Sequence, residues 1–140
     1  PKVNPHQGKE LMDRLSAATE KGLVRACHDC SDGGIGGAIA EMAFAGGLGA
    51  IIHLKSIPLG EPIERDDFIL FSESNSRFLV EVPLESMGEF EEIMEGVSLA
   101  GIGQVTGSEF LEIYGVDGRR VLNVSFDSLK EAWQRPIRCG

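Results

Sequence analysis

A run of polar residues and glycines at positions 28–37 carries the groups best suited to chemistry. It reads His28-Asp29-Cys30-Ser31-Asp32-Gly33-Gly34-Ile35-Gly36-Gly37. Glycines let backbone N–H groups approach a ligand closely, and the first turn of the apolar helix that follows offers unpaired donors with a partial positive charge. The run therefore predicts a phosphate or substrate loop, with Ser31, Gly33 and Gly34 making the contacts. The alternative is a tight strand-to-helix turn in which Ser31 or Asp32 only caps the helix.

A C-x-x-C pair, Cys27 and Cys30, overlaps this loop and encloses His28. Such a pair suits a redox couple or half of a zinc site. A zinc site needs two more ligands, and the other histidines and Cys139 show no second paired spacing. A thioredoxin-like pair lies at a helix start, whereas Cys27 falls in an apolar strand. We therefore expect no metal site, with Cys27 a buried small hydrophobe and Cys30 an incidental neighbour.

A second polar segment, Ser72-Glu73-Ser74, separates an apolar patch from a clear strand. Glu73 can accept a hydrogen bond from a ribose or an amide, and Arg77 can neutralise either Glu73 or a phosphate. In these acidic surroundings the ion pair between Arg77 and Glu73 is the expected outcome. His28 and Asp29 either orient the loop or contact the ligand. No Ser/His/Asp or Cys/His order supports nucleophilic catalysis from these residues alone.

The composition limits the class of protein. A chain of 140 residues with 42% hydrophobic content suits one compact domain. The net charge is -9, and 11 acids fall between Glu61 and Glu95 against only Arg65 and Arg77. Nucleic acid is therefore excluded as an expected partner. No apolar stretch approaches the roughly 20 residues of a membrane span and no signal segment opens the chain, so we expect a cytoplasmic protein. The first residue is Pro1 rather than methionine, which indicates either a piece cut from a longer polypeptide or a processed chain.

The pattern of apolar residues predicts helices alternating with strands early and a cluster of strands late, an α+β fold with a mixed sheet. We expect the core at Ile35, Ile39, Met42, Phe78 and Val80. The expected helices cover 4–22, 35–45, 68–71, 84–96 and 125–136, the first capped by Asn4 and the last by Ser125 or Asp127 and ended by Pro136. The expected strands cover 24–27, 49–54, 77–82, 99–105, 110–116 and 119–124, the last two joined by a type I′ turn at Asp117-Gly118.

Four sequence motifs resemble those of a known protein family. The motifs are His28-Asp29-x-Ser31-Asp32-Gly33-Gly34, Ala40-Glu41-Met42-Ala43, Leu70-Phe71-Ser72-Glu73-Ser74-x-x-Arg77-Phe78 and Leu129-Lys-Glu-Ala-Trp133. Together they look like the C-terminal domain of the synthetase subunit of phosphoribosylformylglycinamidine synthase, the second B-type domain, which is similar to the C-terminal domain of aminoimidazole ribonucleotide synthetase. The resemblance implies a three-layer α/β/α domain with a mixed, largely antiparallel sheet, spanning residues 1–140 as the C-terminal part of a longer synthetase.

The function that the resemblance implies is an ATP-dependent C–N ligase of purine biosynthesis. It converts formylglycinamide ribonucleotide to the amidine with glutamine-derived ammonia. The whole enzyme would use ATP and Mg²⁺, with no cofactor certain for this domain. Its partners would be the remaining A- and B-type domains, a glutaminase subunit and a small accessory subunit, and the isolated piece would be inactive and prone to self-association. The expected phosphate- or substrate-binding residues are His28, Asp29, Ser31, Asp32, Gly33, Gly34, Glu73, Ser74 and Arg77.

Two other functions stay open from the sequence. In the family, the first B domain contributes a Glu-Ser-Gln segment to substrate binding, and Glu73-Ser74-Asn75 looks like its duplicated counterpart. That counterpart holds either a structural nucleotide or nothing, and in the second case the chain is a non-catalytic scaffold. A related hydrogenase maturation or selenophosphate synthetase domain is the third candidate, against which Leu70-Phe71-Ser72-Glu73-Ser74 favours the purine enzyme.

Overall fold

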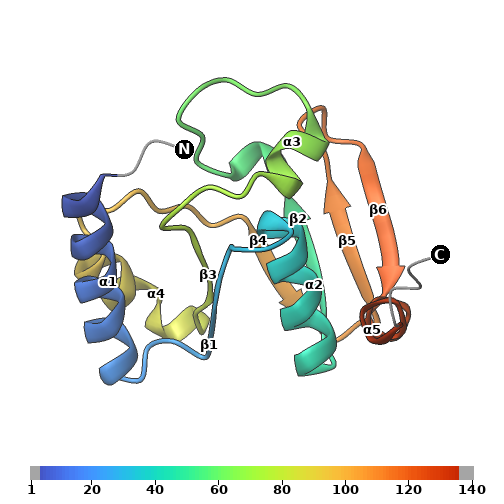
Figure 1. Cartoon of the computed structure of the whole chain (residues 1–140). Coiled ribbons are helices and arrows are strands. Elements are labelled where there is room, and N and C mark those ends of the chain that lie inside the picture. The colour runs from blue at the N-terminus through green and yellow to red at the C-terminus, as the bar shows by residue number, and fades with distance from the viewer. Residues whose placement is uncertain (1–3, 136–140) are drawn as a thin grey trace.

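A computed structural model describes residues 4–135, and helices and strands alternate along them as the sequence predicts (Figure 1). The helices are α1 (Pro5–Glu20), α2 (Gly34–Gly46), α3 (Asp66–Phe71), α4 (Met87–Ile93) and α5 (Phe126–Gln134), with short 3₁₀ turns at Leu54–Ser56 and Leu84–Ser86. The strands are β1 (Ala26–Asp29), β2 (Gly49–His53), β3 (Phe78–Glu81), β4 (Gly103–Thr106), β5 (Phe110–Tyr114) and β6 (Arg120–Ser125).

The strands form two sheets. β1 and β3 make an antiparallel pair, and the other four strands lie in the order β4-β2-β5-β6. Only β2 and β5 run parallel, since β2–β4 and β5–β6 are antiparallel. The predicted α+β class with mixed, largely antiparallel pairing is confirmed, divided between a small sheet and a larger one.

The elements stack in layers (Figure 1). Helices α1 and α4 pack on one face of the β1–β3 pair through a core that includes Leu15, Ala18 and Phe90. On the other side lies α2, whose Ile35 and Ile39 pack in a second core with residues of the four-stranded sheet. The small sheet thus lies between helices on both faces, giving the expected α/β/α order, and the four-stranded sheet adds a fourth layer. No helix within residues 4–135 is long and apolar enough to cross a bilayer.

The helix ends follow local chemistry. The Asn4 side chain accepts the Gln7 N–H at 3.3 Å, and the Ser125 hydroxyl accepts the Ser128 N–H at 3.2 Å, so both predicted caps are confirmed. Helix α2 stops at Gly47, which adopts a left-handed conformation with φ 63. The predicted end of α5 at Pro136 lies outside the described residues.

The β5–β6 hairpin forms as predicted, but its turn differs. Gly118 has φ 81, whereas Asp117 does not have the positive φ that a type I′ turn requires. The Gly118 N–H instead donates to the Gly115 carbonyl at 3.0 Å, and the Gly115 N–H donates to Arg119 at 2.8 Å. A longer hairpin loop needs only one left-handed glycine, because a bulge beside the turn accommodates the extra residue of one strand.

Two strand boundaries shift from the prediction. The strand expected at 24–27 runs Ala26–Asp29, so His28 and Asp29 are part of it. The strand expected from Leu99 begins only at Gly103, and Leu99 is 44% exposed. Gly103 pairs opposite Ile52 so closely that a Cβ there would lie 2.0 Å from the Ile51 carbonyl oxygen. Backbone approach, which glycine alone permits, sets this strand start.

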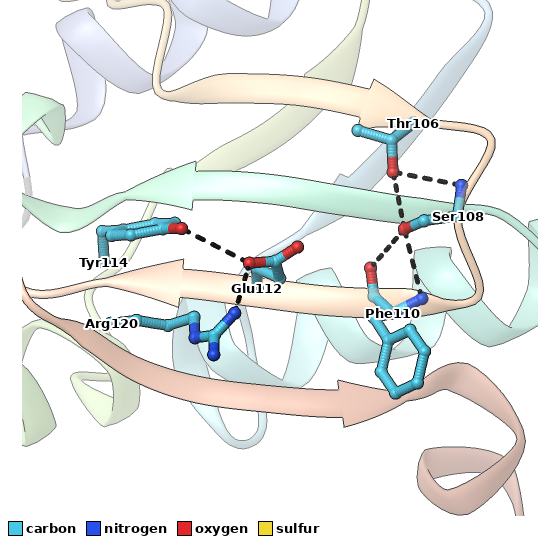
Figure 2. A network of polar contacts seen from close by, with 6 residues as sticks. All are labelled: Thr106, Ser108, Phe110, Glu112, Tyr114 and Arg120. Carbon is cyan, nitrogen blue, oxygen red and sulfur yellow. Dashed lines mark hydrogen bonds and ion pairs between the residues drawn. The ribbon is translucent and has the colours of Figure 1, made fainter.

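The outward face of the four-stranded sheet carries a network of polar contacts beside the exposed ring of Phe110. Figure 2 shows Tyr114 and Arg120 converging on the Glu112 carboxylate, with contacts of 3.3 and 3.0 Å. The ring of His53 stacks on Tyr114 with centroids 5.2 Å apart. Near the β4–β5 connection the Ser108 hydroxyl donates to the Phe110 carbonyl at 3.2 Å and lies 3.0 Å from the Thr106 hydroxyl. The polar groups drawn in Figure 2 therefore bond to one another on this face of the sheet.

Candidate functional site

The two polar segments picked out from the sequence lie on either side of one cleft of about 400 Å³. Strands β1 and β3 bring them together, because they pair with Asp29 opposite Phe78, and the Cys30 N–H donates to the Arg77 carbonyl at 2.9 Å just beyond. The lining residues are Met12, Asp29, Cys30, Ser31, Asp32, Glu73, Ser74, Asn75, Ser76, Arg77 and Phe78. Six of the nine predicted site residues therefore share this cleft.

Gly33 and Gly34 shape the loop at the start of α2. Both are left-handed, with φ 76 and 62, a conformation that is strained for other residues. A Cβ at Gly34 would also lie 2.7 Å from the Leu70 carbonyl oxygen and 2.9 Å from that of Ser72. Helix α2 can therefore press its first turn against the end of α3, which places the segment after α3 beside the loop.

The Glu73 carboxylate already accepts a hydrogen bond from the Gly33 amide, which the sequence predicts as a contact for an anion. The Gly33 N–H donates to Oε1 of Glu73 at 3.1 Å, and the Gly34 N–H donates to the Ser31 carbonyl at 3.0 Å. Gly33 is the N-cap residue, and no side chain of the loop caps the helix, so the alternative in which Ser31 or Asp32 caps it is wrong. Glu73 takes this place from another segment because a helix N-terminus attracts negative charge. A phosphate at this amide has to displace Glu73.

Arg77 does not form the expected ion pair with Glu73. No salt bridge joins the two within residues 4–135. Instead Nη1 of Arg77 lies 3.5 Å from the Ser72 carbonyl oxygen, and Nη2 is buried with no hydrogen-bond partner in the described part of the chain. The prediction fails because the Gly33 amide competes for the Glu73 carboxylate, a contact that spacing along the chain cannot reveal. Arg77 lines the cleft, but its unsatisfied donor is buried rather than exposed there.

His28 and Asp29 have different surroundings. Asp29 lines the cleft, whereas His28 does not. The ring of His28 lies between the Asp29 carbonyl oxygen, 2.7 Å from Nδ1, and the Glu41 carboxylate of α2, 2.8 Å from Nε2. The bond to the Asp29 carbonyl is the largest of the effects that raise the pKa of His28 above its ordinary value, and Glu41 adds to it, against a smaller lowering by burial. The sequence pointed to His28 but missed its partner Glu41.

The cleft also contains residues that the sequence did not single out. Met12 of α1 forms part of its wall, and the chain turns there at Ser76, whose φ of 58 is left-handed. A Cβ at Gly8 would lie 3.2 Å from the Ser76 hydroxyl, so α1 passes close to this turn. The hydroxyls of Ser72 and Ser74 are 3.0 Å apart. The only hint to this wall was the turn-forming pair Asn75-Ser76, since Met12 carries no sequence signal for a site.

The C-x-x-C pair is arranged opposite to expectation. Cys27 is exposed and Cys30 is buried, at 5% exposure. Alternation along β1 turns Cys27 outward, while Cys30 follows the strand and packs beneath the loop. Burial is the largest cause that raises the pKa of both thiols, which disfavours the reactive thiolate. Within residues 4–135 no group of three or more His, Cys, Asp or Glu side chains is placed to hold a metal ion.

Comparison with known proteins bears on this architecture. Residues 1–115 match the family model described as "AIR synthase related protein, C-terminal domain". The chain belongs to this family. A curated relative from Limosilactobacillus reuteri, named "Phosphoribosylformylglycinamidine synthase subunit PurL", is 37% identical over 134 residues. A relative of the same name from Moorella thermoacetica is 33% identical over 139 residues. The alignments cover 96% and 98% of this chain but only 17% and 18% of those relatives.

Solved structures of relatives have the same fold. A chain in the structure of PurLQS from Thermotoga maritima aligns with a TM-score of 0.82 and 27% identity, over 92% of this chain and 22% of that one. The T. maritima PurL complexed with ATP aligns with a TM-score of 0.77 and 28% identity, over 86% of this chain and 21% of that one. A chain of a HypE–HypF complex aligns at 0.66 with 20% identity, which shows a shared fold alone.

Proposed function

We propose that this chain is the C-terminal domain of the synthetase subunit of a phosphoribosylformylglycinamidine synthase. The whole enzyme is an ATP-dependent C–N ligase that converts formylglycinamide ribonucleotide to formylglycinamidine ribonucleotide with ammonia from glutamine. The observation that carries the proposal is the match to PurL relatives along 96% of this chain, together with both motifs lining one cleft.

The domain's part in the reaction is structure and a ligand pocket. The lining side chains include no nucleophile paired with a base, so catalysis belongs to the remaining A- and B-type domains. ATP and Mg²⁺ serve the whole enzyme, where Mg²⁺ offsets phosphate charge. Because no metal-holding cluster occurs within residues 4–135, we assign no step in this domain to the ion. The glutaminase and small accessory subunits are the proposed partners, consistent with the PurLQS assembly of T. maritima.

The cleft suits a ligand with a polar or anionic group. Ser31 and Ser74 supply hydroxyls, and Arg77 supplies a positive charge. Asp29, Asp32 and Glu73 oppose it with negative charge. A phosphate therefore binds when Glu73 releases the Gly33 amide and that amide, with its helix, takes the anion. His28 does not line the cleft, and its ring contacts Glu41 of α2 instead.

The test uses the complete synthetase polypeptide that contains these residues. It is incubated with ATP, formylglycinamide ribonucleotide and ammonium, and ADP and the amidine product are measured together. Equal amounts of ADP and product, dependent on both substrates, are expected. The absence of amidine from a folded synthetase, or ADP release that ignores the ribonucleotide, contradicts the proposed reaction.

A scaffold without a ligand is the second candidate, and the Gly33–Glu73 bond favours it because the helix is already capped. The two candidates differ in nucleotide or phosphate binding at this cleft. The complete synthetase is titrated with ADP, ATP and inorganic phosphate, and compared with variants Arg77→Gln and, as a matched control, Arg65→Gln. Arg65 pairs with the exposed Asp67 and lies outside the cleft. Weaker binding only in Arg77→Gln supports the pocket, and identical isotherms for all three proteins support the scaffold.

A further inference from the structure

The side chain of His28 connects the two elements that flank residues 30–33, which we call the motif loop. It projects from β1, and its partner Glu41 lies in α2, with residues 30–33 between the two elements. Nε2 is 2.8 Å from Oε2 of Glu41, and Nδ1 is 2.7 Å from the carbonyl oxygen of Asp29. The imidazole is 30% exposed and the Glu41 carboxylate 39%, so the bridge is partly shielded from water.

Both groups that face the ring are acceptors. A backbone carbonyl has no proton to give, and an ionised carboxylate only accepts, so each ring nitrogen has to donate. A neutral imidazole carries one N–H and can satisfy only one of them. The arrangement therefore calls for the doubly protonated, cationic ring.

The surrounding charges agree with a cation. On β1, Oδ1 of Asp29 lies 3.8 Å from Nδ1, and on α2 the facing charge is Glu41. On β3, the residue opposite His28 is the uncharged Leu79, and the next acid, Glu81, lies 3.7 Å from Arg25. Both acids beside the ring raise the pKa of His28, after the larger effect of the Asp29 carbonyl.

We infer that His28, as an imidazolium, is a positioning residue that holds the motif loop in place by joining the end of β1 to α2. The loop leaves β1 at Asp29, the residue whose carbonyl accepts from His28. It re-enters the fold at Gly33 and Gly34, on the helix that Glu41 anchors. With both ends held, the Gly33 N–H stays aimed at Glu73 and the cleft. The relevance of this bridge to ligand binding rests on the proposed function, while the bridge itself does not.

The test is ring-nitrogen NMR of the ¹⁵N-histidine-labelled chain, which needs no ligand and therefore cannot fail for the same reason as the proposed reaction. The chain has 3 histidines, so the resonances of His28 are those lost in His28→Gln. At pH 6.5, the ordinary midpoint, more than half of the His28 rings are expected to carry both protons, because the pKa of His28 is raised. A wild-type ring that is less than half doubly protonated at pH 6.5 overturns the inference.

Two variants separate a positioning role from a general effect on the fold. Glu41→Gln removes the charge but keeps the length and an acceptor oxygen, and Glu91→Gln makes the same change at an exposed site on α4. Only Glu41→Gln is expected to lower the titration midpoint of His28 and to speed hydrogen exchange at the Gly33 and Gly34 amides, by about two- to fivefold, the effect of a partly exposed ion pair. An unchanged midpoint in Glu41→Gln, or equal effects of the two variants, overturns the inference.

Discussion

Replacement of Glu73 by alanine tests whether this carboxylate caps α2 from a distant segment. The variant loses the acceptor that lies 3.1 Å from the N–H nitrogen of Gly33 and leaves the start of α2 without a side-chain acceptor for that N–H. A lost N-cap costs about 1 kcal/mol, and the lost charge at the helix N-terminus adds about 0.3 kcal/mol at an exposed site. We therefore expect Glu73→Ala to lower the free energy of unfolding by about 1 kcal/mol, or Tm by about 3 °C.

Urea unfolding followed by circular dichroism measures this change. Glu61→Ala is the matched control, because Glu61 is an exposed loop glutamate that forms no hydrogen bond or ion pair within residues 4–135. Glu73→Gln keeps an acceptor and loses only the charge, so it is expected to lie between wild type and Glu73→Ala. The reasoning is refuted if Glu73→Ala and Glu61→Ala unfold at the same urea concentration.

The remaining predictions concern backbone approach, pH and exposed surface. Gly34→Ala is expected to lower the free energy of unfolding by about 3 kcal/mol, because Gly34 has φ 62 and an added Cβ would clash with the end of α3. The control Gly22→Ala, at φ 75 with open space around it, is expected to cost about 1 kcal/mol. Equal urea midpoints for the two variants would contradict this. Since folding raises the pKa of His28, the contribution of this residue to the free energy of unfolding is complete below pH 6.5 and is lost as pH rises through the pKa of the folded state. Equilibrium unfolding measured across that pH range should show the loss. In His28→Gln this pH dependence should be absent. Phe68 and Phe71 of α3 are 54% and 61% exposed, so the 140-residue chain is expected to self-associate at micromolar concentration in sedimentation velocity, and a purely monomeric profile would rule that out.

Much of the fold follows from short-range patterns. The caps at Asn4 and Ser125, the apolar spacing of α2 and the turn glycine Gly118 act through atoms a few residues apart, and the structure confirms each of them. The predicted core residues Ile35 and Ile39 are buried at 5% and 3% exposure for the same reason. The exact turn type was wrong because it depends on how many residues the hairpin loop admits, and the flanking strands decide that.

The candidate site was predicted in part. The motif residues on the two segments were identified, and most of them line the cleft. Their partners were not: Glu73 bonds to Gly33 instead of Arg77, and His28 bonds to Glu41. The exposure of Cys27 and Cys30 is the reverse of the prediction, because alternation along β1 turns Cys27 outward while Cys30 follows the strand and packs in the core.

The sequence by itself determined the caps at which α1 and α5 begin and which residues of α2 are apolar, since these depend on side-chain chemistry and neighbours in the chain. Only the tertiary structure decided which polar group meets which. Gly33 and Glu73 are 40 residues apart, and they meet because Gly34 lets α2 press against the end of α3. Hydrogen bonds act over about 3 Å, so their partners are chosen only after packing has brought distant segments together.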